Sequence, residues 1–264
     1  MGRTPAANDV PLRLLCLGQS HFGCVSRAAD AGHEALARAG VEITTLVMNQ
    51  PQFDPHFEPG AGLHPALRDE ALRLSATADA VYLSIGGTAH CVFGLMEHEQ
   101  PFDFVLEPEP TLPLLPGREA VAGGLIRGAL ESTSLFRHQR ALRRFLPGVL
   151  RRPLALLESP PPLFDDARLL ANLGGYRRLL TERGIAPAPV RRKLWRLHSF
   201  LVAEDCAAAG IEFVAAPSAA QDTQGYLAPQ ALADDDPTHA NTWYGRRLIE
   251  QMVRRHRADF AFDA

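Results

Sequence analysis

Five short apolar runs, separated by longer segments with helical spacing, constrain the fold of this chain more than any other feature. They cover residues 12–18, 41–48, 80–87, 153–158 and 211–216. Runs of this kind are typical of the buried strands of a parallel sheet. Strands that alternate with helices are joined by crossover connections, so the pattern predicts an α/β fold built on a five-stranded parallel sheet.

The segments between these runs predict the helices and the loops. Helical spacing indicates helices over residues 21–39, 64–77, 118–145, 165–183, 190–209 and 240–256. Gly40 follows the first helix as a C-cap, and Pro147-Gly148 is expected to end the third. Residues 49–63 are rich in Pro, Gly and aromatic residues and are expected to form a loop.

A second long connection, residues 93–117, mixes prolines with acidic and bulky apolar residues. A segment this apolar is expected to pack over another part of the protein instead of serving as a free linker. A chain of 264 residues fits one α/β domain with a sizeable insertion. We therefore predict a single domain over residues 1–264, with an insertion or lid at about 93–150.

Composition and charge argue against several classes of protein. A net charge of −3 gives no electrostatic footprint for nucleic acid. The sequence has no run of about 18 apolar residues, the length that a membrane-spanning helix needs. Residues 1–11 also lack the apolar core of a secretory signal. We therefore expect a cytoplasmic protein with no nucleic-acid or membrane partner, and the oligomeric state is not predicted.

The four cysteines do not have the spacing of a metal site, so neither a metal nor another cofactor is expected. Cys16 falls in a predicted strand and Cys206 in a predicted helix. Buried free thiols are the expected state at both positions.

The carboxyl ends of the predicted strands are where a ligand site belongs in an open α/β sheet. Ser20 lies two residues past the first strand and just before a helix, where its hydroxyl can be exposed beside backbone N–H groups. Asp236 precedes His239 by three residues, between the last strand and the last helix. A carboxylate can hold an imidazole in one tautomer, and that imidazole can accept a proton from a nucleophile.

Each of these features has an ordinary explanation when it stands alone. A serine after a strand commonly caps a helix or forms a turn. Asp-Pro sequences form turns, and exposed histidines are common. The combination is more informative, because the serine, a Gly-Gly-Thr turn after the third strand and the Asp-x-x-His segment all fall at one edge of the sheet.

In this order the blocks resemble the SGNH (GDSL-type) hydrolase superfamily over nearly the whole chain. The first block is Gly18-Gln19-Ser20, the third is Gly86-Gly87-Thr88, and the last runs from Asp236 to His239 with Asn241 and Gly245 beyond it. The resemblance implies a flavodoxin-like three-layer sandwich. It also implies that Ser20 attacks an acyl carbonyl, that His239 is the general base and that Asp236 orients the imidazole. The backbone N–H of Ser20, a glycine N–H and Thr88 would hold the oxyanion.

The chain departs from the family pattern at three places. Gln19 replaces an Asp that is not part of the proton relay. Thr88 replaces Asn, whose longer side chain donates to the oxyanion, so Gly87, Thr88 and a compensating donor such as His90 are the candidate oxyanion or substrate-binding residues. The glycine of the second block is either Gly60 or Gly62, although both also fit turns.

Three further residues have alternative explanations. His21, beside the nucleophile, could tune that nucleophile, but it is expected to cap the helix that follows. Cys91 would be a nucleophile only if it contacted His90 in space. Glu158 ends a strand at the functional edge, where it would either contact substrate or shape the turn.

The resemblance predicts a serine esterase that acts on a small-molecule or carbohydrate ester, with the insertion after Thr88 as a substrate wall. Two alternatives stay open. The same triad could transfer the acyl group to an alcohol or amine in a shielded pocket. The chain could also be a binding protein that keeps the fold without a competent oxyanion hole.

Overall fold

The computed structural model describes residues 10–234 and 236–262, and a five-stranded sheet lies at the centre of this part of the chain. Its spatial order is β2 (Val41–Val47), β1 (Leu12–Gly18), β5 (Ala80–Ser84), β8 (Leu154–Leu157) and β9 (Glu212–Val214). All neighbouring pairs are parallel. Counted along the chain, this is the 2-1-3-4-5 order of flavodoxin-like folds. The predicted fold class is confirmed.

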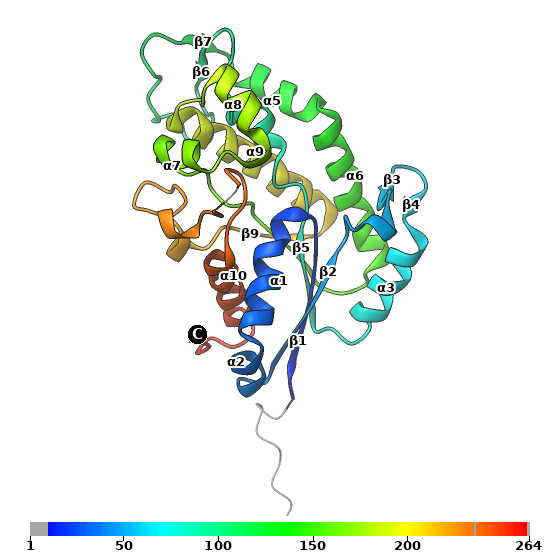
Figure 1. Ribbon diagram of the computed structural model, residues 1–264. Helices are drawn as coiled ribbons and strands as arrows, with labels where there is room; N and C mark the ends of the chain where they lie inside the picture. Colours follow the sequence, from blue (N-terminus) through cyan, green and yellow to red (C-terminus); the bar gives the residue numbers. More distant parts are fainter. Residues whose placement is uncertain (1–9, 235, 263–264) are drawn as a thin grey trace, which may run out of the picture.

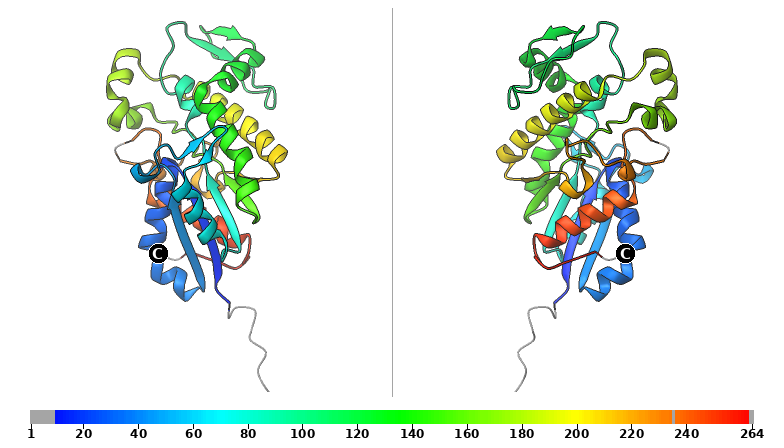
Figure 2. Two further views of the ribbon diagram at one scale, coloured as in Figure 1. Left: turned by 90° about the vertical axis from the view of Figure 1, so that its right-hand side faces the viewer. Right: turned by 90° about the vertical axis from the view of Figure 1, so that its left-hand side faces the viewer.

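Helices cover both faces of the sheet, as Figures 1 and 2 show. Helices α1 (Gly23–Ala31) and α10 (Thr242–Arg254) lie on one face. Helices α3 (Pro65–Ser75), α6 (Ser134–Val149) and α9 (Ala188–Ala209) lie on the other. The result is a three-layer sandwich.

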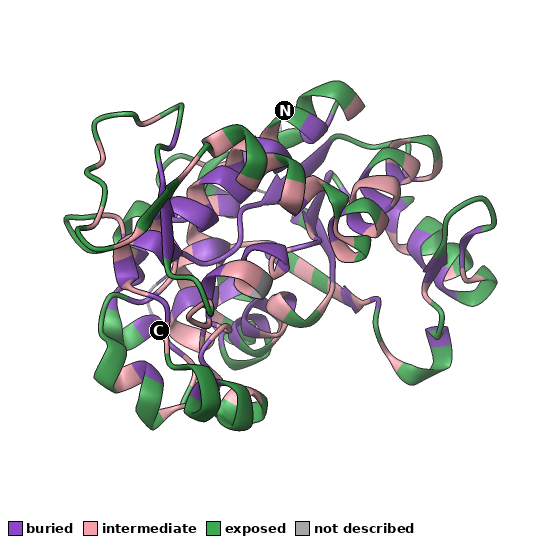
Figure 3. Ribbon diagram, turned by 90° about the horizontal axis from the view of Figure 1, so that it is seen from above, coloured by how far each residue is buried: buried purple, intermediate pink, exposed green. Residues whose placement is uncertain are grey.

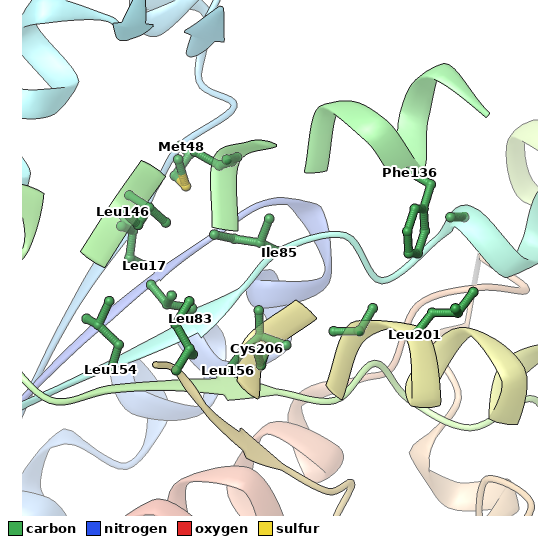
Figure 4. Close-up of a cluster of buried hydrophobic side chains, with 14 of the residues drawn as sticks. Leu17, Met48, Leu83, Ile85, Phe136, Leu146, Leu154, Leu156, Leu201 and Cys206 are labelled. Atoms are coloured by element: carbon green, nitrogen blue, oxygen red, sulfur yellow. The ribbon is translucent and has the colours of Figure 1, made fainter. Parts of the chain in front are cut away.

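The alternation of side chains along each strand divides the core between these layers. In β1, Leu14 and Cys16 point to the layer of α1 and α10, whereas Leu15 and Leu17 point to the opposite one. Figure 4 shows Leu17 in the cluster between the sheet and the layer of α3, α6 and α9, together with leucines of β5, β8, α6 and α9. Seen from above, the buried residues line the sheet and the inward faces of the helices (Figure 3). This two-sided burial explains why the strands are apolar runs rather than alternating ones.

The other elements form the connections and the part of the molecule above the carboxyl edge of the sheet (Figure 1). The remaining α-helices are α2 (His33–Arg38), α4 (Ala89–Gly94), α5 (Gly123–Ser132), α7 (Asp166–Ala171) and α8 (Arg177–Arg183). The 3-10 helices are η1 (Ser20–Phe22), η2 (Pro51–Phe53), η3 (Gly174–Tyr176), η4 (Ser218–Ala220) and η5 (Pro229–Ala231). Two small sheets pair β3 (Phe57–Glu58) with β4 (Gly62–Leu63), and β6 (Phe102–Phe104) with β7 (Glu119–Val121).

Three helices that the sequence predicts as continuous are divided in the structure. The segment 165–183 is divided into α7, η3 and α8. The segment 21–39 breaks at Gly32, which separates α1 from α2. The segment 118–145 contains β7, α5 and α6, and it breaks at Thr133, whose side chain accepts a hydrogen bond from the Phe136 N–H at 3.2 Å. An N-cap of this kind begins a new helix without disturbing the apolar spacing that suggested a single one.

Two predicted ends also differ from the structure. Pro147 lies inside the last turn of α6, which continues to Val149. Strand β5 ends at Ser84, before Gly87, because Gly86 takes a positive φ of 85° that a strand does not allow.

The proline-rich connection packs on the protein, as its composition predicts. Asp103 is buried and accepts hydrogen bonds from Lys193 Nζ of α9 at 2.8 and 2.9 Å, and Lys193 is itself buried. Leu115 N–H donates to the same carboxylate at 2.8 Å. A buried ion pair that also receives backbone hydrogen bonds fixes this segment against α9. The assignment of residues 93–150 as a lid stays a prediction, and α6 within that range belongs to the layer on the sheet.

Two smaller observations concern the cysteines and the membrane. Cys16 and Cys206 are buried free thiols, as predicted. Among residues 10–234 and 236–262, no helix combines the length and the apolarity needed to cross a bilayer.

The N-terminal and C-terminal parts of the chain meet where α1 packs on α10. Gly245 allows this approach, because a Cβ at that position would overlap the carbonyl of Cys24 and would lie 3.0 Å from the Ala28 Cβ. Backbone atoms cannot move aside as a flexible side chain can, so the two helices would have to separate.

Replacement of Gly245 by Ala should therefore lower the free energy of unfolding by about 3 kcal/mol or more, because the overlap is with backbone. The matched control is Gly128→Ala in α5, where an added Cβ would meet nothing within 4 Å. That substitution should be neutral or stabilising by about 0.5–1 kcal/mol. Urea unfolding followed by circular dichroism measures both, and equal midpoints for the two variants would contradict the account of this contact.

Candidate active site

The three sequence blocks meet at the carboxyl edge of the sheet. The end of β1 is joined to the end of β5 by a hydrogen bond from Gln19 N–H to the Ser84 carbonyl at 3.0 Å. The third block follows β5 directly, and the last block precedes α10. Asn241 fixes that last block, since its Oδ1 accepts from Tyr244 N–H at 3.3 Å and caps α10. Its side-chain amide donates to the Leu232 carbonyl at 3.1 Å.

Asp236 and His239 form a hydrogen-bonded pair. His239 Nδ1 lies 2.9 Å from Asp236 Oδ2. The other carboxylate oxygen accepts from the backbone N–H and the hydroxyl of Thr238, both at 2.7 Å, and from His239 N–H at 3.1 Å. Burial alone would raise the pKa of Asp236, but the hydrogen bonds from His239 and Thr238 hold that pKa well below its ordinary value. The carboxylate is therefore charged, and it leaves Nε2 of His239 as the nitrogen available for chemistry.

The ring of His239 stacks on the ring of His21, with centroids 4.3 Å apart and planes inclined by 25°. His239 Nε2 and both ring nitrogens of His21 are buried, and none of the three has a hydrogen-bond partner in the described part of the chain. The expectation that His21 caps a helix is thus wrong, because its ring lies in the site. Burial, followed by the charges of His239 and His90, lowers the pKa of His21 to about 3, so this ring is neutral at neutral pH.

Ser20 is the first residue of η1 and is exposed. No hydrogen bond joins its Oγ to His239 or to any other residue that the structure describes. The next residue along the chain, His21, does contact His239, so the first and last blocks meet in space. The role of Ser20 as nucleophile stays a prediction.

The side chain of Gln19 connects the first block to the third. Its Oε1 accepts from Gly86 N–H at 3.3 Å, and its Nε2 lies 3.0 Å from His56 Nε2. The residue that replaces the family's Asp therefore bridges the end of β1, the turn after β5 and the loop before β3. This bridge gives Gln19 a structural function at the edge of the sheet.

Gly87 and Thr88 form the turn that leads into α4. An added Cβ at Gly87 would lie 3.0 Å from both His21 Cδ2 and Ser159 Cβ, so a larger residue there would require the buried imidazole or Ser159 to shift by a few tenths of an ångström. Thr88 occupies the N-cap position of α4, but its side chain makes no capping hydrogen bond. The backbone N–H groups of Ser20 and Gly87 have no acceptor within the described ranges. Their assignment as oxyanion donors, like that of Thr88, stays a prediction.

His90 is buried and lies between two other side chains. Its Nε2 is 3.4 Å from Cys91 Sγ, and its ring centroid is 5.3 Å from that of His198. Burial lowers the pKa of His90 to about 4 and raises the pKa of the Cys91 thiol to about 12. The spatial contact that a Cys–His pair needs is present, but the thiol is protonated and is not an activated nucleophile. Nothing in these contacts tests His90 as an oxyanion donor.

The two glycines considered for the second block both serve the turn between β3 and β4. Gly60 and Gly62 have φ values of 93° and 98°, which favour glycine. An added Cβ at Gly62 would also lie 2.8 Å from the Phe145 ring. The turn therefore accounts for both residues.

A small cavity of about 30 Å³ lies beside His239. It is lined mainly by apolar side chains from four parts of the chain, α4, the segment after β8, the start of α9 and the loops around α10. The lining consists of His90, Cys91, Gly94, Leu95, Pro161, Pro162, Leu163, Leu169, Arg191, Leu227, Leu232, Pro237, Thr238 and His239. Most of these residues carry no motif, so the sequence alone did not indicate them.

Two other residues lie at this edge of the sheet, His198, which the sequence did not indicate, and Glu158, which was expected either to contact substrate or to shape the turn. His198 of α9 is buried against His90, and its pKa is lowered well below 6.5 by burial and then by His90. Glu158 is buried as well, and its Oε2 accepts from Ala216 N–H at 2.8 Å, which supports the explanation that it shapes the turn. In the part of the chain that the structure describes, no group of three or more His, Cys, Asp or Glu is arranged to hold a metal ion.

Comparisons with known proteins give matches only at the level of structure. No protein-family model matches the sequence, and no curated protein matches it. An extracellular lipase from Streptomyces rimosus is 11% identical, with 92% of this chain and 99% of that chain covered and a TM-score of 0.46. A GDSL-like lipase from Bacteroides thetaiotaomicron is 14% identical, with 92% of this chain and 86% of that chain covered and a TM-score of 0.40. The periplasmic domain of a lipopolysaccharide acetyltransferase from Salmonella ser. Paratyphi A is 13% identical, with 93% of this chain and 84% of that chain covered and a TM-score of 0.42.

These solved structures are similar to this chain in fold alone. Identities of 11–14% assign neither a residue nor a substrate.

The buried histidines make the stability of the fold depend on pH. The unfolded chain binds protons near pH 6.5, whereas His21 and His90 in the folded state bind them only near pH 3 and 4. The free energy of unfolding is therefore highest above about pH 6.5, and it decreases as the pH falls toward the pKa of each folded-state histidine. For each histidine this decrease should be about 2 kcal/mol between pH 6.5 and 5.

Urea unfolding at neutral pH and at about pH 5 measures this dependence. The His90→Gln variant lacks one of these buried histidines, so it should lose about 2 kcal/mol less than the wild type over the same pH interval. Identical losses in the two proteins would show that His90 does not stay neutral in the folded state.

Proposed function

We propose that this chain hydrolyses an acyl ester by a serine acyl-enzyme route, with Ser20 as nucleophile, His239 as general base and Asp236 as the residue that orients the imidazole. The observation that carries the proposal is the Asp236–His239 pair, 2.9 Å apart, which stands beside the N-terminal block at the carboxyl edge of the sheet. This is the edge where open α/β sheets bind their ligands.

In the proposed reaction, Ser20 Oγ gives its proton to His239 Nε2 and forms a bond to the acyl carbon. His239 then returns the proton to the leaving alcohol as the ester C–O bond breaks. Water repeats the two steps and releases the acid. The negative charge on the carbonyl oxygen would be held by the N–H groups of Ser20 and Gly87, with Thr88 and His90 as further candidate donors.

The reaction requires Ser20 Oγ to contact His239 Nε2. No hydrogen bond among the described residues joins these two side chains. Catalytic hydrogen bonds are often long in proteins without substrate and tighten when substrate binds. Ser20 is exposed and its side chain is free to change rotamer, whereas His239 is held by Asp236 and His21. We therefore propose that the serine, not the histidine, moves into position.

A fluorophosphonate probe tests this proposal directly, because an unactivated serine does not react with it. Wild-type protein should be labelled and Ser20→Ala should not, and hydrolysis of an activated ester should fall by about 10⁴-fold or more in the variant. Equal labelling of the two proteins would instead favour a non-catalytic binding protein that keeps the fold.

Asp236→Asn should lower kcat by about 10²–10⁴-fold, because the amide no longer holds the imidazole in the productive tautomer. The matched control is Asp222→Asn. Asp222 Oδ1 accepts from Gln224 and Tyr226 N–H at 2.8 and 2.9 Å, a similar turn whose own residues, 222–226, are not among those that line the cavity. A steady-state assay at saturating ester should show the loss only for Asp236→Asn, and equal losses would assign the effect to turn stability.

One observation favours acyl transfer as a second candidate function. The Nε2 atom of His239 is buried, and a site that excludes water protects an acyl-enzyme from hydrolysis until an acceptor binds. If transfer dominates, adding alcohols or amines at millimolar concentration to an activated ester should yield acylated acceptor faster than free acid. Product analysis by mass spectrometry distinguishes the two, and free acid alone with every acceptor would support hydrolysis.

A further inference from the structure

The size of the cavity beside His239 limits what the proposed enzyme can take as an acyl group. The cavity measures about 30 Å³. One water-sized probe needs about 10–15 Å³ on this scale, and an engineered cavity of about 150 Å³ holds benzene. The space therefore fits about two non-hydrogen atoms beyond the carbonyl carbon.

The chemistry of the walls suits a small apolar group. Leu163, Leu169, Leu227 and Leu232 line the cavity and are all buried. Such walls favour a methyl or ethyl group by removing it from water, at about 0.8 kcal/mol for each CH₂. These four leucines carry no charge that would attract a phosphate or a free carboxylate.

The polar atoms in the lining are held in fixed positions. Arg191 is buried, with Nη1 2.7 Å from Asp166 and Nη2 donating to the Leu163 carbonyl at 2.7 Å. Its Nε and the Nδ1 of His90 are buried without a partner in the described part of the chain. Because Arg191 ties α9 to the segment after β8, this wall cannot move outward without breaking those bonds.

Cys91 is the lining residue best placed to set the size limit. It lies in the first turn of α4, is only partly buried and has its Sγ 3.4 Å from the ring of His90. Its side chain is in no core cluster of buried residues but packs against the cluster of Leu95, Leu173 and Leu180. Removal of the sulfur would therefore enlarge the cavity without removing a buried core side chain.

We propose that the cavity receives the acyl group of the substrate, that it admits acetyl and propionyl groups but not longer chains, and that Cys91 sets this limit. The inference rests on the proposed esterase or transferase function, since it places the acyl carbon bonded to Ser20 next to His239. A longer chain would have to displace residues of the lining, which include buried side chains such as Leu169 of α7, 1% exposed.

The experiment compares kcat/KM for nitrophenyl acetate, butyrate and hexanoate. One additional methylene that a pocket cannot accept costs about 10–200-fold, so the wild type should favour acetate over hexanoate by about 10²-fold or more. Cys91→Ala should raise the butyrate-to-acetate ratio by about 10-fold. Cys91→Leu, which fills the cavity, should lower turnover of all three esters while the circular dichroism spectrum stays that of the wild type.

The matched control is Cys206→Ala, which shortens a buried cysteine outside the cavity. It should leave the ratio of butyrate to acetate unchanged. A wild type that prefers hexanoate, or equal ratios in Cys91→Ala and Cys206→Ala, would overturn the inference.

A binding measurement separates failure of this inference from failure of the proposed function. If the wild type hydrolyses no ester, or if Ser20→Ala is as active as the wild type, the catalytic proposal fails. Acetamide and hexanamide are then titrated into protein with labelled histidines, and the imidazole resonances of His90 and His239 are followed. Shifts with acetamide alone in the wild type, and with both amides in Cys91→Ala, support the size limit. Shifts with hexanamide in the wild type, or with neither amide, overturn it.

Discussion

The packing of α1 against α10 is the contact on which the candidate site depends. The two helices come from opposite ends of the chain, and Gly245 lets their backbones approach where a side chain would overlap the Cys24 carbonyl. The 3-10 turn η1 precedes α1 and the Asp236–His239 loop precedes α10. Close packing of the helices therefore holds His21 against His239, 4.3 Å between ring centroids. If the helices separated, the first and last blocks would no longer share a site.

The loop before α10 holds its histidine mainly through a single carboxylate. Asp236 accepts from two backbone N–H groups and from one hydroxyl, and its second oxygen is left for His239 Nδ1. The same group therefore shapes the turn and orients the imidazole. Stacking on His21 restricts the ring from the other side. Contacts within the protein thus fix the imidazole, which is the positioning that the proposed acid–base catalysis requires.

The site is unusual in the number of buried imidazoles around it. His21, His90 and His198 all have lowered pKa values, mainly because burial disfavours their charged forms. They stay neutral at neutral pH and add no positive charge beside His239. Folding gains this neutral environment at the expense of stability in acid, since the unfolded chain takes up protons that the folded chain does not.

The sequence by itself determined the fold class and the pairing of Asp236 with His239. Apolar runs that alternate with helical spacing are local signals, and burial on both faces of a parallel sheet gives such runs directly. Asp236 and His239 are three residues apart, so turn geometry alone could bring them together. The apolar character of residues 93–117 was also enough to predict that they pack on the protein.

Tertiary structure alone decided which distant residues surround the dyad. His21 was expected to cap a helix, but its ring lies on a residue 218 positions away because α1 packs on α10. Leu169, Arg191 and Leu227 carry no motif, and they become a cavity wall only when separate segments fold over the sheet edge. The break at Thr133 was likewise hidden, because one side-chain hydrogen bond can divide a helix without changing its apolar period. Local patterns determine elements, whereas the contacts between elements depend on how close their backbones can approach.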